Sequence, residues 1–147
     1  MNYRRLTAAD LDVVAEIEAA VQLDAWSRAQ ILAVADLAHY HGWVAELDGT
    51  ITGYIIVQNV VDAFEVLTIG VAKSQQGRGI GGQLWQHAWA DMREMQPNIN
   101  RCFLEVRASN HAAQALYARC GFTQIANRRN YYQNPREDAF ILQKSDD

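Results

Sequence analysis

The stretch Gln76-Gly77-Arg78-Gly79-Ile80-Gly81-Gly82 is a glycine-rich loop that opens directly into a helix. The apolar run from Phe64 to Val71 precedes it and predicts a strand. Glycines admit a ligand close to the backbone, and the first turn of a helix offers unpaired N–H groups to an anion. The loop therefore suits a pyrophosphate, to which Arg78 can add a cationic contact. The helix is predicted from apolar residues at helical spacing, which are Ile80, Leu84, Ala88, Met92 and Met95.

Several phosphate-binding motifs compete for this loop. Gly77, Gly79 and Gly82 satisfy G-x-G-x-x-G, but residues 72–76 separate them from the strand, whereas a dinucleotide fingerprint follows its strand by a tight turn. A dinucleotide fold also needs further strand–helix repeats, for which the chain has neither room nor pattern. A Walker loop needs Lys and then Ser or Thr after its last glycine, and that pattern is absent. The remaining motif is Gln-x-x-Gly-x-Gly, residues 76–81.

The other periodic segments predict a mixed sheet flanked by helices. Ser27 and Gln30 form a capping box for the second helix. Asp48-Gly49 stands between two alternating runs and signals a hairpin, and Gly121 is placed to be the left-handed cap of the last helix. The predicted helices are 7–21, 27–37, 80–95 and 110–119, and the predicted strands are 3–6, 43–47, 51–57, 64–71, 102–106, 122–128 and 139–143.

Length and composition indicate one domain over residues 1–147. Half of the residues are hydrophobic, yet no apolar run approaches the roughly 20 residues that span a bilayer. The first six residues lack the apolar core of a signal peptide, so we expect a cytoplasmic protein without membrane contact. The net charge of −4 disfavours direct nucleic-acid binding, which relies on cationic patches, and is compatible with basic peptides.

No metal site is expected. Cys102 and Cys120 form no Cys-x-x-Cys pair and match no metal spacing, so they are expected to be free thiols. His39 and His41 supply two ligands at most.

The motif of residues 76–81 resembles the coenzyme A pyrophosphate loop of the GNAT acetyltransferases. Ile69-Gly70-Val71 is similar to the strand whose backbone pairs with the pantetheine arm in that superfamily. Residues 104–110, Leu-Glu-Val-Arg-Ala-Ser-Asn, with Ala115-Leu116-Tyr117 and Gly121-Phe122, resemble its second motif. More narrowly, these residues and 128–139 resemble the RimI subfamily, bacterial enzymes that acetylate the N-terminal alanine of a small-subunit ribosomal protein.

The resemblance implies a fold, a co-substrate and a set of site residues. The fold would be the α/β GNAT acyl-CoA N-acyltransferase fold, a mixed, mostly antiparallel sheet of about seven strands flanked by about four helices. Acetyl-CoA would be the co-substrate, without a metal, and the acceptor would be the N-terminus of a ribosomal protein with a basic N-terminal segment. Glu105 would accept a proton and Tyr117 would donate one. Cofactor-binding roles would fall to Ile69, Gly70, Val71, Gln76, Gly77, Arg78, Gly79, Ile80, Gly81, Gly82 and Asn110.

Each candidate residue also has a plainer interpretation. Glu105 can be a strand carboxylate in a salt bridge with Arg107, and Tyr117 can border the core. Asn110 is also a good helix N-cap. Tyr131 and Tyr132, in the polar segment between the last two strands, can hold the substrate peptide or pack across the hairpin. Trp26 can anchor the junction of the first two helices or wall the peptide groove, and we favour the anchor.

Alternative functions remain open from the sequence. The enzyme can acetylate lysine side chains or a small-molecule amine, or the chain can be a coenzyme A sensor without catalysis. Two departures from the RimI pattern bear on the acceptor peptide. Ala25 replaces the usual proline before Trp26-Ser27, and the connection Met95–Asn100 is longer than usual.

Overall fold

A seven-stranded sheet forms the centre of the molecule, in the order β1-β2-β3-β4-β5-β7-β6. The computed structural model describes residues 1–34 and 36–145. The strands are β1 (Asn2–Arg5), β2 (Tyr40–Leu47), β3 (Thr50–Val60), β4 (Ala63–Val71), β5 (Arg101–Arg107), β6 (Thr123–Tyr132) and β7 (Glu137–Ser145). The helices are α1 (Leu11–Val21), α2 (Arg28–Val34), α3 (Ile80–Met95) and α4 (His111–Arg119), with 3₁₀ turns at Ala8–Asp10 and Lys73–Gln75.

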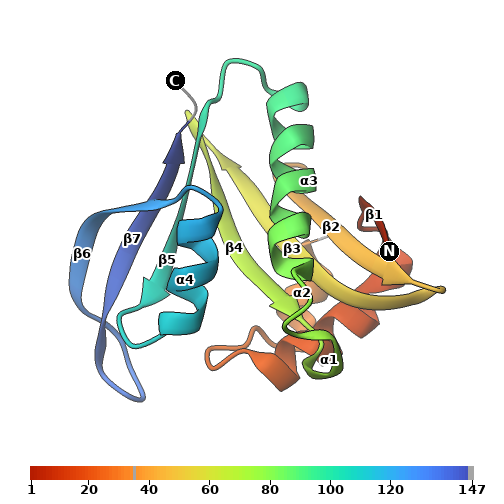
Figure 1. Cartoon of the computed structure of the whole chain (residues 1–147), viewed down its shortest axis with the longest axis horizontal. Helices are drawn as coiled ribbons and strands as arrows, with labels where there is room; N and C mark the ends of the chain where they lie inside the picture. Colours follow the sequence, from red (N-terminus) through yellow and green to blue (C-terminus); the bar gives the residue numbers. More distant parts are fainter. Residues whose placement is uncertain (35, 146–147) are drawn as a thin grey trace.

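Helices cover both faces of the sheet (Figure 1). α3 and α4 pack on one face, where Leu84, Trp85 and Tyr117 join the larger core cluster. α1 and α2 pack on the other face, where Val14 and Ile31 join a second cluster with Tyr54 from β3. Each helix directs one apolar stripe at the sheet, so burial of these stripes holds the layers together.

The sheet is split between β4 and β5. These neighbours are parallel, and their register consists of the pairs Phe64–Cys102 and Glu65–Phe103. Beyond those pairs β4 continues to Val71 and β5 to Arg107, and Figure 1 shows the two strands diverging. The other neighbouring strands pair antiparallel. The molecule therefore has two half-sheets, β1–β4 and β5–β7–β6, that meet at one end and open at the other.

The predicted fold class is confirmed: a mixed, mostly antiparallel seven-stranded sheet with four α-helices. The turn chemistry is also as predicted, since Asp48 and Gly49 both have positive φ in the β2–β3 hairpin. Gly121 has a φ of +95° directly after the last helix. In the Ser27–Gln30 capping box, the Ser27 backbone N–H donates to Gln30 Oε1 and the Gln30 N–H donates to Ser27 Oγ.

Two boundary predictions are wrong. The second helix ends at Val34 and not near Leu37. Beyond Val34, hydrogen bonds between residues three apart, such as Leu37 N–H to Val34 O, replace the α-helical pattern. Ala35, inside the predicted range, lies outside the described residues. Tyr131 and Tyr132 belong to strand β6 and not to a loop, because β6 bulges between Arg128 and Tyr132 and then resumes pairing with β7.

Candidate active site

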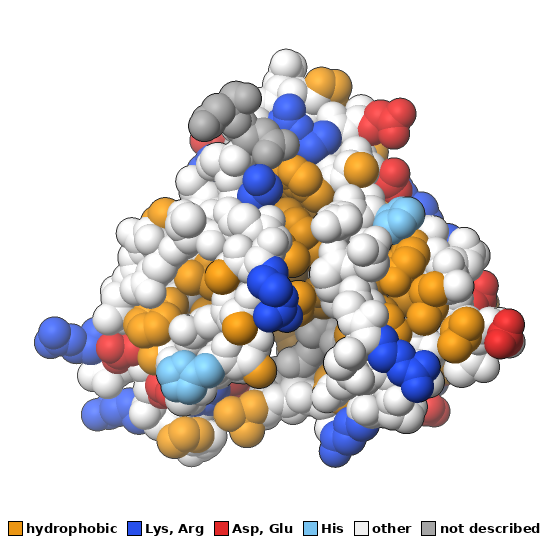
Figure 2. All heavy atoms as spheres, viewed as in Figure 1, with side chains coloured by type: hydrophobic (Ala, Val, Ile, Leu, Met, Phe, Trp, Pro, Cys, Tyr) orange, Lys and Arg blue, Asp and Glu red, His pale blue; other side chains and the backbone are white. Residues whose placement is uncertain are grey.

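The glycine-rich loop walls a cavity of about 450 Å³ at the start of α3. Figure 2 shows the surface hollowed between the positions of α3 and α4. Nine of the residues expected to bind the cofactor line this cavity, namely Ile69, Gly70, Val71, Gln76, Gly77, Gly79, Ile80, Gly81 and Gly82. Arg78 is exposed and is absent from the lining, and Asn110 lines a neighbouring cavity. The strand end, the loop and the first helical turn thus come together around one space.

The loop presents its backbone to the cavity. Gly77 and Gly79 have φ values of +82° and +78°, in the left-handed region that favours glycine. Gln76 Nε2 donates to the carbonyl oxygen of Val71 at 3.0 Å and so ties the loop back to β4. The helical ladder starts with the Gln83 N–H donating to Gly79 O. The N–H groups of the preceding turn therefore have no intrahelical acceptor and suit a phosphate group.

A second cavity, of about 630 Å³, lies in the opening of the sheet. It shares Val21, Gln22, Ile69, Ala113 and Leu116 with the first cavity, so the two adjoin each other. Its lining brings together the predicted catalytic and substrate residues, Glu105, Tyr117, Tyr131, Tyr132, Trp26 and Asn110. These residues come from β5, α4, β6 and the α1–α2 connection.

Glu105 faces this second cavity from β5. Its Oε1 lies 3.4 Å from Nη1 of Arg128, whose side chain is mostly exposed. A hydrogen bond to Glu105 is the main cause that raises the pKa of Tyr131. The alternative interpretation, a salt bridge between Glu105 and Arg107, is wrong in its partner, because Arg107 pairs with Asp24 and Glu137.

Tyr117 is buried between the cavity and the core. Its ring packs edge-on against Phe122, with the ring centroids 5.5 Å apart. Burial is the main cause that raises the pKa of the Tyr117 hydroxyl, so the hydroxyl keeps its proton at neutral pH. The side chain therefore borders the core and also lines the second cavity.

The other polar candidates have defined structural contacts. Asn110 is the N-cap of α4, and its Oδ1 accepts from the Ala113 N–H at 3.2 Å. Trp26 packs against the core cluster under α1 and α2, and its backbone N–H donates to Glu18 Oε2 at 3.0 Å. Trp26 also lines the second cavity, so its contact with an acceptor peptide stays a prediction.

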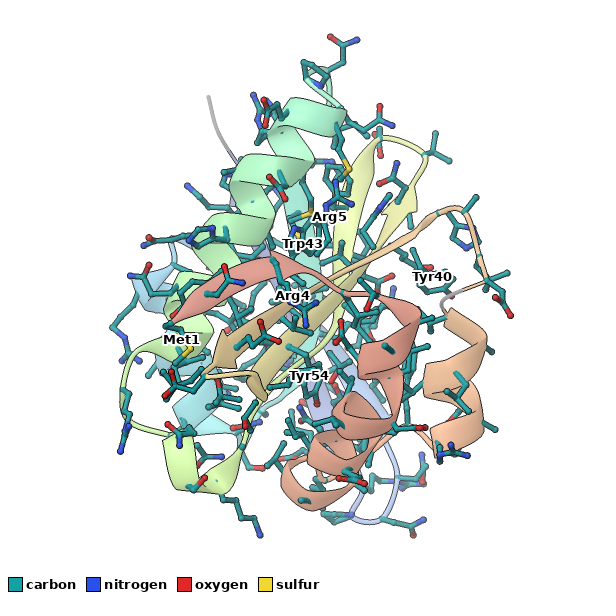
Figure 3. All side chains as sticks on the ribbon, turned by 90° about the vertical axis from the view of Figure 1, so that its right-hand side faces the viewer. Met1, Arg4, Arg5, Tyr40, Trp43 and Tyr54 are labelled. Carbon is teal, nitrogen blue, oxygen red and sulfur yellow. The ribbon has the colours of Figure 1, made fainter. Side chains whose placement is uncertain are left out.

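A buried carboxylate under the site was missed at the sequence level. Glu18 is 1% exposed, and its Oε1 accepts from the hydroxyls of Tyr54 and Thr68. These bonds connect α1 with β3 and β4 beside the cavity, and Tyr54 lies between the sheet and α1 (Figure 3). The signal was available: Glu18 falls on the apolar stripe of α1 with Leu11 and Val14, where a charged residue needs polar partners.

Arg107 was considered only as a partner of Glu105, yet it organises the mouth of the cavity. Its Nε and Nη2 donate to the two carboxylate oxygens of Asp24 at 2.8 and 2.9 Å. Nη1 donates to Pro135 O and Glu137 Oε1, and Nη2 donates also to Gln133 O. A guanidinium has five N–H donors, so each one has an acceptor. The guanidinium carbon also lies 4.4 Å from the ring centroid of Tyr132.

Two kinds of feature are absent from the described residues. Within residues 1–34 and 36–145, His, Cys, Asp and Glu side chains form no group of three or more that could hold a metal ion. None of the helices in that part of the chain is long and apolar enough to cross a membrane.

Comparison with known proteins relates this architecture to one family. The acetyltransferase (GNAT) family model matches residues 11–122. The chain is 35% identical to the N-alpha-acetyltransferase RimI of Mycobacterium tuberculosis over 147 aligned positions, which cover 95% of this chain and 89% of the relative. The crystal structure of the ribosomal-protein-S18-alanine N-acetyltransferase from Escherichia coli superposes with a TM-score of 0.88 at 30% identity and covers 98% of this chain and 92% of that one. Arabidopsis thaliana NAA60 in complex with acetyl-CoA has a TM-score of 0.87 at 18% identity and covers 99% of this chain and 99% of that one, and it supports the fold alone.

Proposed function

The chain belongs to the acetyltransferase (GNAT) family, and from that premise we propose that it transfers the acetyl group of acetyl-CoA to the N-terminal alanine of a small-subunit ribosomal protein. The Escherichia coli relative, which is named for this activity, aligns along nearly the whole chain, and this supports the proposal. The proposed substrate implies a cytoplasmic reaction.

One observation carries the proposal. The cavity beside the glycine-rich loop adjoins the cavity lined by Glu105 and Tyr117, and five residues line both. The first cavity suits the pyrophosphate and pantetheine parts of acetyl-CoA, because helix N–H groups and the open side of β4 face it. Such a cofactor would have its thioester directed toward the second cavity, where an acceptor amine can meet it.

The proposed chemistry needs one base and one acid. Glu105 takes a proton from the acceptor ammonium, directly or through water, and the neutral amine attacks the thioester carbonyl carbon. The tetrahedral adduct collapses, the C–S bond breaks, and the Tyr117 hydroxyl gives its proton to the leaving thiolate. The adduct nitrogen loses its extra proton, which restores the Tyr117 hydroxyl and leaves the neutral amide. An α-amine has a pKa of about 7.7–8.0, against about 10.4 for lysine. An N-terminal acceptor is therefore easier for the base to deprotonate than a lysine side chain.

The charge of the second cavity supports a cationic acceptor. Four carboxylates line it, those of Glu18, Asp24, Glu65 and Glu105. Among the described lining residues Arg107 is the one cationic side chain, and its charge is matched by Asp24 and Glu137. A protonated N-terminus followed by basic residues is electrostatically favoured in such a space. Tyr131 and Tyr132 are proposed to contact the peptide backbone there.

Mass spectrometry of a peptide mixture with acetyl-CoA tests the proposal. The mixture contains peptides with free N-terminal Ala, Ser or Met and basic tails, together with N-blocked peptides that carry one lysine. We expect acetylation concentrated on the alanine terminus. Acetylation of lysine or of a small amine alone would move the substrate to another class, and the absence of any product would favour a coenzyme A sensor.

A binding measurement separates the co-substrate from the acceptor. Coenzyme A at about 100 times its Kd is expected to stabilise the fold by about 2.7 kcal/mol, because it binds the folded state alone. NAD and NADP serve as the matched controls and are expected to leave the melting temperature unchanged. A shift with NAD and none with coenzyme A would contradict the proposed co-substrate.

A further inference from the structure

The two half-sheets are joined again at their open end by one ion pair. At the closed end, the pairs Phe64–Cys102 and Glu65–Phe103 connect β4 with β5. At the open end, Arg107 at the end of β5 binds Asp24, which lies between α1 and α2. α1 packs on β3 and β4 and therefore moves with the first half-sheet. The bond between Asp24 and Arg107 thus spans the opening.

Both walls of the second cavity converge on this pair. Leu23, Asp24 and Trp26 of the α1–α2 connection line one side, and Tyr131 and Tyr132 of β6 line the other. On the β6 side, the Arg107 guanidinium binds the carbonyl oxygens of Gln133 and Pro135 and lies against the Tyr132 ring. On the α1–α2 side, its contact is the bidentate bond to Asp24. That bond therefore links the two walls at the mouth of the cavity.

We infer that the Asp24–Arg107 pair is a clasp that sets the width of the second cavity, and that Asp24 is a positioning residue for the acceptor peptide. The inference rests on the proposed function, because the second cavity is the proposed site of the acceptor peptide. Asp24 touches no reacting atom and acts through the α1–α2 connection. The clasp lies at the mouth of the second cavity. The glycine-rich loop lines the first cavity, on the other side of the residues that both cavities share.

Asp24 is the end of the clasp that can be changed without unfolding the site. Arg107 is 5% exposed, so its replacement would leave Glu137 and two carbonyl groups without their donors. The Asp24 side chain is 49% exposed and can be solvated once the pair is broken. In an Asp24→Asn variant, Arg107 keeps Glu137, the two carbonyl oxygens and the Tyr132 ring. The hairpin is therefore expected to stay in place, while residues 22–27 lose one restraint and keep the bond from the Trp26 N–H to Glu18.

The test combines steady-state kinetics with hydrogen exchange. Asp24→Asn is expected to raise the KM for an alanine-terminated peptide about five- to tenfold, the effect of losing a bidentate charged pair at a half-exposed site. The kcat and the KM for acetyl-CoA are expected to stay within about twofold of wild type. Backbone amides of residues 22–27 are expected to exchange faster, and those of the β6–β7 hairpin are expected to keep their protection.

Two variants serve as controls. Asp12→Asn breaks the exposed ion pair between Asp12 and Arg28, which also joins α1 and α2 but lies outside both cavities. It is expected to change neither the peptide KM nor the exchange of residues 22–27. Asp24→Glu keeps the carboxylate and is expected to restore at least part of the peptide KM, which a general loss of packing would not allow.

Unchanged exchange of residues 22–27 in Asp24→Asn would overturn the clasp. An equal rise in the KM values for peptide and for acetyl-CoA would overturn its role in acceptor positioning. Failure of the proposed function is distinguishable, because the wild-type enzyme would then acetylate no alanine-terminated peptide. The kinetic measurement then uses whichever amine the wild-type enzyme acetylates. If it acetylates none, the hydrogen-exchange measurement alone decides whether the pair holds the two walls together.

Discussion

Glu105 illustrates how strand alternation directs a single side chain. Its neighbours Leu104 and Val106 are buried on the α3 side of the sheet, so Glu105 points to the opposite face and into the second cavity. The sequence alone could not separate a catalytic carboxylate from a structural one, because both occupy such a position. The contacts now show Glu105 near Tyr131 and the exposed Arg128, with Arg107 committed elsewhere.

Replacing Glu105 with glutamine tests its proposed role as the base. The amide keeps the size of the side chain but cannot accept a proton, so kcat/KM is expected to fall by about 10²–10⁴. Calorimetry is expected to show unchanged binding of acetyl-CoA. Glu94→Gln, at an exposed position of α3, is the control. Activity within about threefold of wild type in Glu105→Gln would reject Glu105 as the base.

Tyr117 allows the chemical and the packing contributions of one side chain to be separated. Tyr117→Phe removes the hydroxyl and keeps the ring against Phe122, so we expect kcat to fall by about 10²-fold with the melting temperature nearly unchanged. Tyr117→Ala removes the ring as well and is expected to lower the free energy of unfolding by about 3–5 kcal/mol. Unchanged kcat in the phenylalanine variant would show that another group protonates the thiolate.

Strand β4 shows how closely an element can be fitted to its neighbours. Gly70 pairs with Tyr54 of β3, and a Cβ built on Gly70 would lie 2.5 Å from the Tyr54 hydroxyl oxygen. That hydroxyl donates to the buried Glu18. Glycine at this position therefore serves a close approach between strands. The sequence predicted a strand end and, through the resemblance, a cofactor contact at Gly70, but not this approach to Tyr54.

Gly70→Ala is expected to destabilise the protein by about 1–3 kcal/mol, because Tyr54 must move and its bond to Glu18 is strained. Urea denaturation measures the change. Gly82→Ala is the comparison, because a Cβ there has only Leu116 Cδ1 at 4.0 Å and lies inside helix α3. That variant is expected to be as stable as wild type or slightly more stable. Equal stability of the two variants would contradict the close-approach argument.

The first half-sheet is connected to its helical layer by a network of charges. Arg4 of β1 donates to both oxygens of Asp10 in the 3₁₀ turn and to Glu46 of β2. On the other side of β1, Arg5 lies beside Trp43, with the guanidinium carbon 5.1 Å from the ring centroid (Figure 3). The hydrogen bond from Arg4 is the main cause that lowers the pKa of Asp10.

This network predicts a loss of stability in acid. Because the folded pKa of Asp10 lies below its unfolded value of about 3.9, the contribution is complete above that value and is lost as the pH falls through the folded pKa. Denaturation by urea at several pH values between about 2 and 6 is expected to show a steep fall below about pH 4. Asp10→Asn is expected to be less stable than wild type at neutral pH and to show a shallower fall. Identical slopes would contradict the assignment.

Much of the fold and part of the candidate site could be predicted because their causes are local. Turn residues such as Asp48 and Gly49, the capping pair Ser27 and Gln30, and the stripe that begins at Ile80 act through neighbours a few residues away. The same holds for the glycine-rich loop, whose conformation depends on its own backbone.

Only the tertiary structure decided which distant side chains meet. The opening between β4 and β5, the pairing of Arg107 with Asp24 across it, and the burial of Glu18 against Tyr54 join residues from 36 to 83 positions apart. Each pairing depends on strand order and on the divergence of two strands, and local periodicity carries no information on either. A charge can also be satisfied by several partners of similar chemistry, as Arg107 shows, and packing of the whole chain selects among them.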